Sequence, residues 1–256
     1  MLESIILGTL QGITEWLPIS SEGIIVLVKN YFFQSSLLDL IKFALFLHLG
    51  TFFAALIYFW KDVKKLILTL FNKENEVKEL KFLIIATVVS GILGLIILYF
   101  IELFENNLTG NIVNLIIGIM LIITGILQLK VKKSKLRSKK DLKVKDGLIL
   151  GVLQSLAIIP GLSRSGLTVS VLLLSKFREE DALKLSFLMS LPIVLGANII
   201  LNFNGLLFSL ENLIALLFSF IFGILTIHLL LKLAKKINFG YFALIFGLIV
   251  LLAVLI

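Results

Sequence analysis

The stretch "PGLSRSGLT", residues 160–168, places an arginine and three hydroxyl side chains between two strongly apolar runs. Arg164 carries a permanent charge and five N–H donors, which suits the oxygens of a phosphate group. The other groups in the stretch that can hydrogen-bond a phosphate are Ser163, Ser165, Thr168 and the backbone of Gly166. Because burying such groups in apolar surroundings costs free energy, the stretch predicts a binding site for a phosphate-bearing ligand.

A second polar stretch, "EWLPISSEG" at residues 15–23, supplies the opposite charge. Glu15 could bind a divalent cation or a water molecule, and Ser20, Ser21 and Glu22 follow it. An acid that faces an arginine also has a purely structural interpretation. The pair could be a buried ion pair that holds two loops together, with the serines capping helices.

Three further polar residues in apolar runs are candidate accessory groups. His48 lies beside Gly50 in "FLHLGTFF" and could either line the pocket or make a structural hydrogen bond. Gln11 and Gln154 occupy equivalent positions before the two polar stretches, where they could line the pocket or bridge helices.

The composition predicts a helical membrane protein. Of 256 residues, 59% are hydrophobic and only 16% are charged, and the mean hydropathy is +1.10. A soluble domain carries about a quarter charged residues. Residues 82–103, 109–129 and 212–231 are apolar runs near the roughly 20 residues that a helix needs to cross a bilayer. Cysteine is absent, which excludes disulfides and thiol chemistry.

The basic residues predict the topology. All lysines and arginines except Lys29, Lys42 and Arg164 fall in four loops, at 61–81, 130–145, 176–184 and 232–237. The connections near 102–109 and 202–211 carry acidic side chains but no basic ones. The positive-inside rule therefore places the four basic loops in the cytoplasm and the two acidic connections outside. We attribute the net charge of +8 to these loops, and expect 130–145 to be a solvated, lipid-facing loop that binds no nucleic acid.

Two segments remain after the spans are assigned. The predicted spans are 39–60, 82–103, 109–129, 185–201, 212–231 and 239–256. Residues 146–176 begin and end beside cytoplasmic lysines, and their halves are short, so they form either a re-entrant hairpin broken at Pro160-Gly161 or two short spans. We favour the hairpin, and residues 1–35 are expected to form a second one that enters from outside.

The two leftover segments look like copies of each other. "ILGTLQ" at 6–11 and "ILGVLQ" at 149–154 differ at one position, and Pro18 and Pro160 follow at nearly the same offset. Three spans separate the copies, so the second copy is inverted in the membrane. The sequence predicts one integral membrane domain, 1–256, with repeats at about 1–103 and 146–231. The hairpin tips are expected to meet in one polar pocket.

Longer motifs extend the comparison to a known family. "LQGITEWLPISSEG", "LHLGTFFAALIYFWKD" and "GVLQSLAIIPGLSRSG" resemble the bacitracin-resistance family of undecaprenyl-diphosphate phosphatases, and the resemblance covers nearly the whole chain. It implies six spans and two re-entrant hairpins. It also implies hydrolysis of a polyprenyl diphosphate to the monophosphate plus phosphate, which recycles a lipid carrier for cell-envelope or glycan synthesis. The implied setting is the outer face of the cell membrane, with Mg²⁺ or Ca²⁺ as cofactor and a homodimer as assembly.

The resemblance also carries residue roles. Glu15 matches the second acid of a paired-glutamate motif and would bind the metal or orient water. Ser21 matches the serine of that motif, and Ser163, Arg164 and Thr168 match the second motif. The departures are Gln11 in place of the family's first glutamate and Ile24 in place of its histidine. Glu22 and His48 are candidate replacements for the lost carboxylate and imidazole.

Three hypotheses follow. In the first, the chain is a polyprenyl-diphosphate phosphatase in which Glu15, Ser21, Ser163 and Arg164 are catalytic, and the nucleophile is a serine or water. In the second, the same fold is a polyprenyl-phosphate transporter or flippase, or a non-catalytic lipid-phosphate binder, for which Gln11 and Ile24 need no replacement. A purely structural membrane subunit is a third reading.

Overall fold

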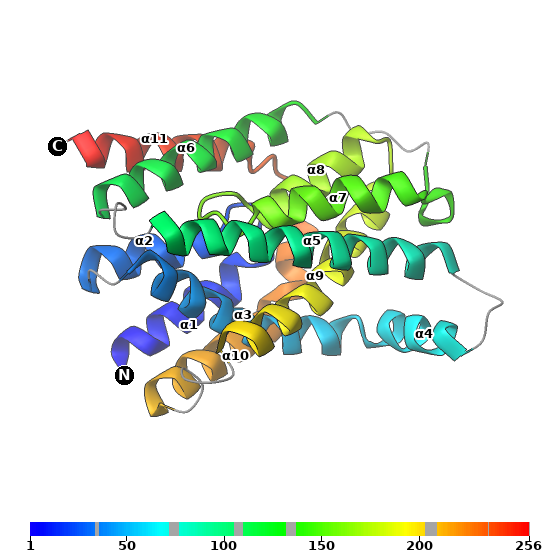
Figure 1. The fold of residues 1–256 in the computed structure, drawn as a ribbon, viewed down its shortest axis with the longest axis horizontal. Coiled ribbons are helices and arrows are strands. Elements are labelled where there is room, and N and C mark those ends of the chain that lie inside the picture. Colours follow the sequence, from blue (N-terminus) through cyan, green and yellow to red (C-terminus); the bar gives the residue numbers. More distant parts are fainter. Residues whose placement is uncertain are drawn as a thin grey trace.

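The computed structural model describes residues 1–33, 36–71, 77–104, 110–131, 137–202, 209–234 and 236–255, and within them the chain is helical with no β-strand. Most helices run along the long axis of the molecule (Figure 1). Five are long and apolar enough to cross a membrane, namely α3 (Leu37–Tyr58), α5 (Val77–Phe104), α6 (Gly110–Leu129), α9 (Glu179–Asn202) and α10 (Leu210–Ala234). The predicted all-α, multi-pass architecture is confirmed at this level.

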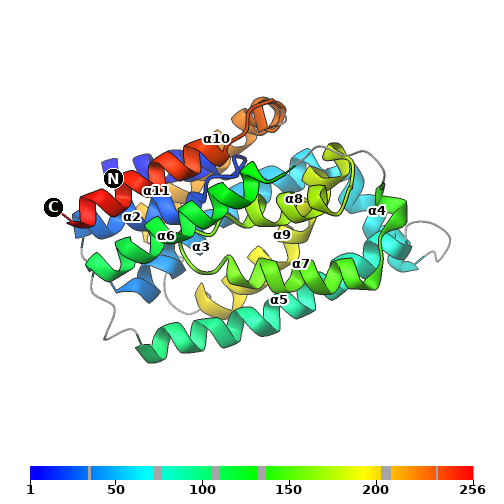
Figure 2. The same cartoon turned by 90° about the horizontal axis from the view of Figure 1, so that it is seen from above.

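The sixth predicted span, 239–256, forms a shorter helix than expected. Helix α11 (Gly240–Leu255) has 16 residues, fewer than the roughly 20 that span a bilayer upright. It packs side by side with α6 (Figures 1 and 2). A Cβ atom on Gly118 would lie 2.6 Å from the Leu251 side chain, so the missing side chain is what allows this close approach.

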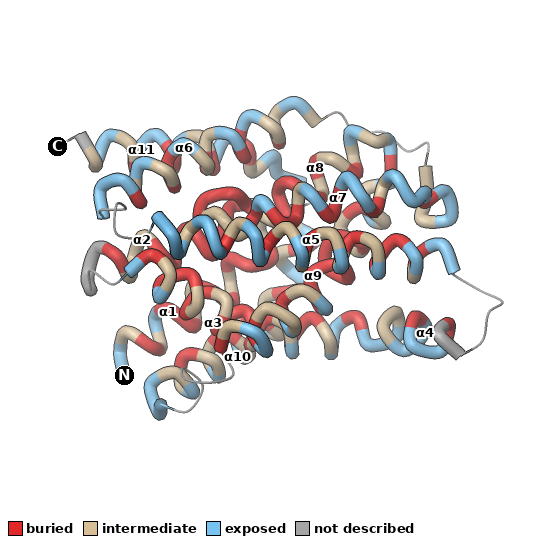
Figure 3. Tube along the Cα trace, in the orientation of Figure 1, coloured by how far each residue is buried: buried red, intermediate tan, exposed pale blue. Residues whose placement is uncertain are grey.

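Two pairs of short helices correspond to the leftover segments of the sequence. Helices α1 (Leu2–Thr14) and α2 (Ser21–Phe33) form the first pair. Helices α7 (Val144–Leu156) and α8 (Arg164–Leu174) form the second. We call residues 15–23 and 157–166, which are the two connections together with the first turn of the helix that follows each, the first and second tips. Both tips lie in the middle of the molecule, where the chain is most buried (Figure 3).

Equivalent hydrogen bonds cap the helix that follows each tip. The Gly23 amide donates to Ser20 Oγ over 3.2 Å, and the Gly166 amide donates to Ser163 Oγ over 3.0 Å. Ser20 therefore matches Ser163 in structure, whereas the sequence offset that aligns Pro18 with Pro160 would pair Ser21 with Ser163. The turns require unusual backbone, because Ser20 has φ 64° and Gly161 has φ 98°.

Three of the four basic loops lie at one end of the molecule, and the acidic connections lie at the other (Figure 1). Ion pairs join Lys139 to Glu79 at 2.7 Å and Lys184 to Asp62 at 2.9 Å, which gathers three of the basic loops at one end. At the other end the N-terminal amine lies 3.4 Å from Glu211. Residues 105–109, 132–136 and 203–208 of the predicted connections lie outside the described residues.

Two predicted loops prove to be more ordered than expected. Residues 60–71 of the first basic loop form helix α4 (Trp60–Phe71), because apolar and charged residues alternate there with helical periodicity. In the 130–145 run, Arg137 makes an ion pair with Asp146 at 2.6 Å and stacks 4.1 Å over the Phe177 ring. This part of the run is therefore docked on the protein, which corrects the prediction of a solvated loop.

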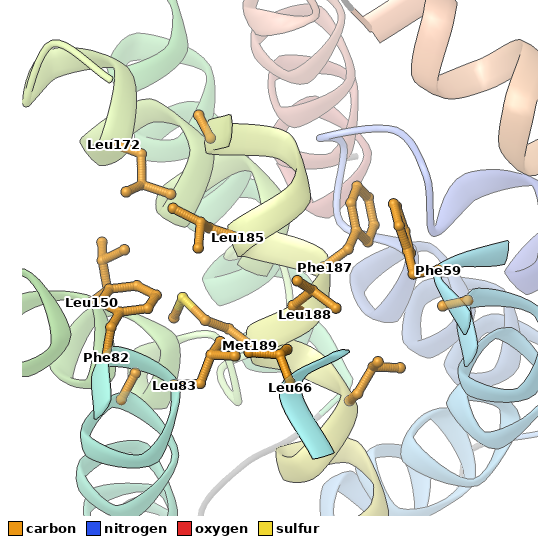
Figure 4. Close-up of a cluster of buried hydrophobic side chains, with 14 of the residues drawn as sticks. Phe59, Leu66, Phe82, Leu83, Leu150, Leu172, Leu185, Phe187, Leu188 and Met189 are labelled. Atoms are coloured by element: carbon orange, nitrogen blue, oxygen red, sulfur yellow. The ribbon is translucent and has the colours of Figure 1, made fainter. Parts of the chain in front are cut away.

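Helix α9 anchors the hydrophobic core next to the tips. Figure 4 shows Phe187 and Met189, which are no more than 1% exposed, within a cluster that also contains Phe59. The ring of Trp16, in the first tip, lies 5.5 Å from Phe187. The core thus fixes the first tip against α9.

Candidate active site

The two tips touch each other. A Cβ atom on Gly23 would lie 2.9 Å from the backbone nitrogen of Gly161, which is closer than real Cβ atoms come. Helix α6 braces both sides of this contact. Its Gln128 donates to the Pro18 carbonyl over 2.5 Å, and its Thr124 accepts a hydrogen bond from the Ser163 amide at 3.3 Å. The predicted convergence of the two polar stretches is therefore present.

Arg164 and Glu15 form the direct link between the tips. Arg164 Nη2 donates to Glu15 Oε1, and Nη1 donates to the Ser186 carbonyl over 3.2 Å. The Arg164 side chain is 16% exposed and that of Glu15 is 6% exposed. The guanidinium also lies 5.6 Å from the Phe187 ring. Two of its five N–H donors meet acceptors among the described residues, so others can bind a ligand.

Glu15 is crowded with donors. Its Oε2 lies 3.1 Å from Gln11 Nε2, 2.6 Å from Ser21 Oγ and 3.1 Å from His48 Nε2. Its other oxygen faces the guanidinium. A carboxylate has about four acceptor positions. Three groups crowd those of Oε2, and Arg164 takes one of those of Oε1. For Glu15 to bind a cation, a donor on Oε2 must leave, or the cation must approach Oε1 against the charge of Arg164.

His48 contacts the backbone through one ring nitrogen and Glu15 through the other. Its Nδ1 lies 2.7 Å from the Ala44 carbonyl oxygen, which can only accept a hydrogen bond, so Nδ1 carries a proton. Nε2 faces the Glu15 carboxylate, and that contact requires a second proton on one of the two groups. His48 thus makes both the structural hydrogen bond and the pocket contact that the sequence left as alternatives.

Glu22 differs from Glu15 in having no partner for one oxygen. The residue is 8% exposed, and its Oε1 has no hydrogen-bond partner among the described residues. Together with Glu15 it lines a cavity of about 30 Å³, which is large enough to hold water. The other polar side chains of this cavity are those of Ser20, Ser21, His48, Ser163, Arg164 and Ser165.

Three predicted site residues lie elsewhere. Thr168 is fully buried, and its hydroxyl lies 2.7 Å from that of Ser186 and donates to the Arg164 carbonyl. It therefore positions Arg164 and does not line the cavity. Gly166 serves in the helix cap. Gln154 donates to Ser90 Oγ over 3.1 Å, beside the larger cavity described next.

A larger, mainly apolar cavity of about 270 Å³ extends from the site between α5, α7 and α9. Glu22, His48 and Arg164 lie at one part of its wall. Elsewhere the wall contains Gly94 of α5 and Gly196 of α9, where an added Cβ would meet nothing within 4 Å. We call this cavity the apolar groove. The missing side chains keep it open.

The residues that hold the tips in place were not among the site residues predicted from the sequence. Thr124, Gln128 and Ser186 contact tip atoms or Arg164 directly. A signal existed for two of them, since Thr124 and Gln128 are four residues apart in the otherwise apolar second half of α6 and so share a face. Nothing in the sequence distinguishes Ser186 from the neighbouring Ser190.

The structural alternative accounts for part of this arrangement. A buried ion pair joins the tips, and serines cap both following helices. It does not account for the water-sized cavity or for the unpartnered carboxylate oxygen of Glu22, because buried polar groups are normally hydrogen-bonded. Among the described residues, no three His, Cys, Asp or Glu side chains gather closely enough to hold a metal ion without other ligands.

Comparisons with known proteins cover the whole of this architecture. The family model described as Bacitracin resistance protein BacA matches residues 4–252. A protein named undecaprenyl-diphosphatase from Methanococcoides burtonii is 44% identical over 96% of this chain and 95% of its own length. Proteins of the same name from Methanothrix thermoacetophila and Haloarcula marismortui are 37% and 35% identical, over 98% and 96% of this chain and 95% and 94% of their own lengths.

Proposed function

The chain belongs to the Bacitracin resistance protein BacA family, and we propose that it hydrolyses undecaprenyl diphosphate, or a similar polyprenyl diphosphate, to the monophosphate plus phosphate. Relatives that match it over nearly their full length bear the name undecaprenyl-diphosphatase. The multi-pass helical architecture supports a substrate that lies in the bilayer.

One observation carries the proposal. The Arg164 guanidinium, which has N–H donors to spare, meets the Glu15 carboxylate inside the molecule. The breaks between two pairs of short helices converge there on a cavity with several hydroxyl groups. Polar backbone at this depth is tolerated where it lines a cavity, and ligand sites of inverted-repeat membrane proteins are built in this way. The site suits a phosphate headgroup with an apolar tail.

Arg164 binds the diphosphate. Its side chain lines the cavity and has N–H donors that no described residue accepts, and Ser163 and Ser165 beside it can donate to phosphate oxygens. As the bridging P–O bond breaks, negative charge develops on the departing lipid monophosphate. A fixed guanidinium with low exposure stabilises this charge more than water would.

Glu15 takes the proton of the attacking oxygen. The Ser21 hydroxyl already donates to Glu15 over 2.6 Å, so it is the hydroxyl best placed to attack. The new P–O bond forms to the terminal phosphorus, the bridging P–O bond breaks, and its electron pair leaves with the lipid monophosphate. Water then releases phosphate from Ser21. In a one-step route, water attacks directly and Ser21 only holds the carboxylate in place.

A divalent cation, Mg²⁺ or Ca²⁺, would neutralise phosphate charge at this site. Mg²⁺ is commonly held by one or two carboxylates together with substrate phosphates and water. The donor set fits this mode, since Glu15 and Glu22 both line the cavity. It does not form a complete protein cage within the described part of the chain.

The apolar groove accommodates the first part of the prenyl chain. It runs from Arg164 along the apolar residues of α5 and α9, and the rest of the chain lies in the bilayer. In this proposal the protein crosses the cell membrane six times. The two short-helix pairs are re-entrant hairpins of an inverted repeat, and the site opens to the outer face. The homodimer implied by family resemblance stays a prediction.

The test is phosphate release from a C55 prenyl diphosphate by purified protein. We expect one phosphate per lipid and a prenyl monophosphate product. In liposomes, movement of the lipid between leaflets without phosphate release would contradict the proposal and support the transport hypothesis instead.

A further inference from the structure

Glu22 carries a buried carboxylate that takes no part in the bond-making and bond-breaking steps of the proposed reaction. The residue is 8% exposed, and its Oε1 has no partner among the described residues. Leaving a buried carboxylate oxygen without a hydrogen bond is destabilising. Such a group either faces a ligand or is compensated elsewhere.

Its surroundings are those of a ligand site. Glu22 lines the cavity of about 30 Å³ that also contains Arg164 and Ser163, and it reaches the apolar groove as well. It therefore lies where a diphosphate bound to Arg164 would meet the start of its prenyl chain. This inference rests on the proposed function for the identity of that anion.

Glu15 and Glu22 differ in how easily a cation can reach their carboxylate oxygens. Three donors surround Glu15 Oε2, and Arg164 occupies Oε1, so a cation can reach Glu15 only by displacing a donor or by approaching a guanidinium. Glu22 Oε1 needs no such displacement. Charge and accessibility therefore both favour Glu22 as the carboxylate ligand of a cation.

From these contacts we infer that Glu22 is the protein's main ligand for the divalent cation. Glu22 would hold the cation beside the bound diphosphate, where the cation would neutralise phosphate charge. Because the described residues provide no three-ligand cluster, cation binding depends on the phosphate ligand. Glu15 is left to interact with His48, Ser21 and Arg164.

The test measures Mn²⁺ binding to the full-length protein in nanodiscs by the electron paramagnetic resonance signal of free Mn²⁺. It is run with and without methylenediphosphonate, which is not hydrolysed. We expect methylenediphosphonate to tighten Mn²⁺ binding. Glu22→Gln should weaken Mn²⁺ binding in its presence by at least about tenfold, the lower range for losing a partner of a metal site.

Matched variants make the result specific. Glu15→Gln should weaken Mn²⁺ binding less than Glu22→Gln does. Glu102→Gln, the same change at an exposed carboxylate of α5, should leave it unchanged. In cation-free buffer, Glu22→Gln should not lower the melting temperature, because Gln keeps the size of the side chain and carries no charge that burial would penalise. This second readout also shows that the variant is folded.

The outcomes separate this inference from the proposed function. Mn²⁺ binding by Glu22→Gln equal to that of the wild type, or no Mn²⁺ binding by the wild type, overturns the inference even when phosphate is released from prenyl diphosphate. If Glu22→Gln loses Mn²⁺ binding but the wild type shows no phosphatase activity, the assignment of Glu22 as cation ligand stands. The proposed phosphatase reaction is then contradicted.

Discussion

The guanidinium of Arg164 donates to the carboxylate of Glu15 across 149 residues of sequence. Each group lies at the break between two short helices, and the two breaks belong to different copies of the repeat seen in the sequence. The contact joins the halves of the protein at the place where the polar side chains gather. It therefore links the stability of the fold to the chemistry of the site.

Removing one partner of this pair should destabilise the protein. We expect Arg164→Ala to lower the free energy of unfolding by about 3 kcal/mol, since Glu15 would be left as a buried charge without its guanidinium. Adding Glu15→Gln should restore much of this stability but no activity. The measurement is unfolding in an SDS titration. A double variant as unstable as Arg164→Ala would show that the pair does not act through charge.

The close contact between the tips should depend on the absence of a side chain at Gly161 and at Gly23. Gly161→Ala places a Cβ atom 2.6 Å from the Ile117 carbonyl oxygen at a φ of 98°, and we expect a loss of about 1–3 kcal/mol from the backbone alone. Gly23→Ala should separate the tips and lower the rate of phosphate release. Gly110→Ala is the control, because Gly110 lies outside the site and the groove and its Cβ would come no closer than 3.3 Å, to the Asn30 side chain. Equal rates in Gly23→Ala and Gly110→Ala would contradict the tight contact.

Filling the apolar groove should act on long substrates. Gly196→Leu introduces a side chain into open space, so the fold should tolerate it. We expect KM for a C55 prenyl diphosphate to rise about tenfold, which corresponds to losing roughly two buried methylene groups at about 0.8 kcal/mol each. KM for a C5 prenyl diphosphate should not change. Val88→Leu, at a position of α5 that is 53% exposed, is the control. An equal rise in KM for both substrates would show that the prenyl chain does not lie in the apolar groove.

The role of Ser21 can be separated from that of Glu15. If Ser21 attacks the phosphorus, Ser21→Ala should abolish the formation of a phosphoserine and lower kcat by at least about 100-fold, the lower range for losing a catalytic group. If water attacks, the loss should be small, because Ser21 then supplies one of several hydrogen bonds to Glu15. Rapid-quench mass spectrometry of the protein with substrate distinguishes the two routes.

Much of the architecture could be predicted from patterns in the amino-acid sequence. Apolar run length predicted the long helices, and the placement of lysines predicted which connections share an end. Pro18 and Pro160 marked the two breaks. These features depend on the cost of polar groups in lipid, which acts on composition and spacing. The meeting of Glu15 and Arg164 followed from the same reasoning.

The remaining features depend on packing that a linear pattern does not encode. Sequence analysis could not show that three donors crowd one oxygen of Glu15 while Glu22 keeps an oxygen free. It also could not show that Thr168 faces Ser186 and not the cavity. Each outcome depends on which way a side chain points after helices from distant parts of the chain have packed together.

The most direct measurement is the rate of phosphate release from a C55 prenyl diphosphate by Arg164→Ala and Glu15→Ala. Arg178→Ala, the same change at an arginine whose side chain is 55% exposed, is the control. We predict that each of the first two substitutions lowers kcat/KM by at least about 100-fold, as the loss of one well-placed charge-stabilising group does, and that Arg178→Ala leaves it unchanged. Wild-type rates in both Arg164→Ala and Glu15→Ala would contradict the account.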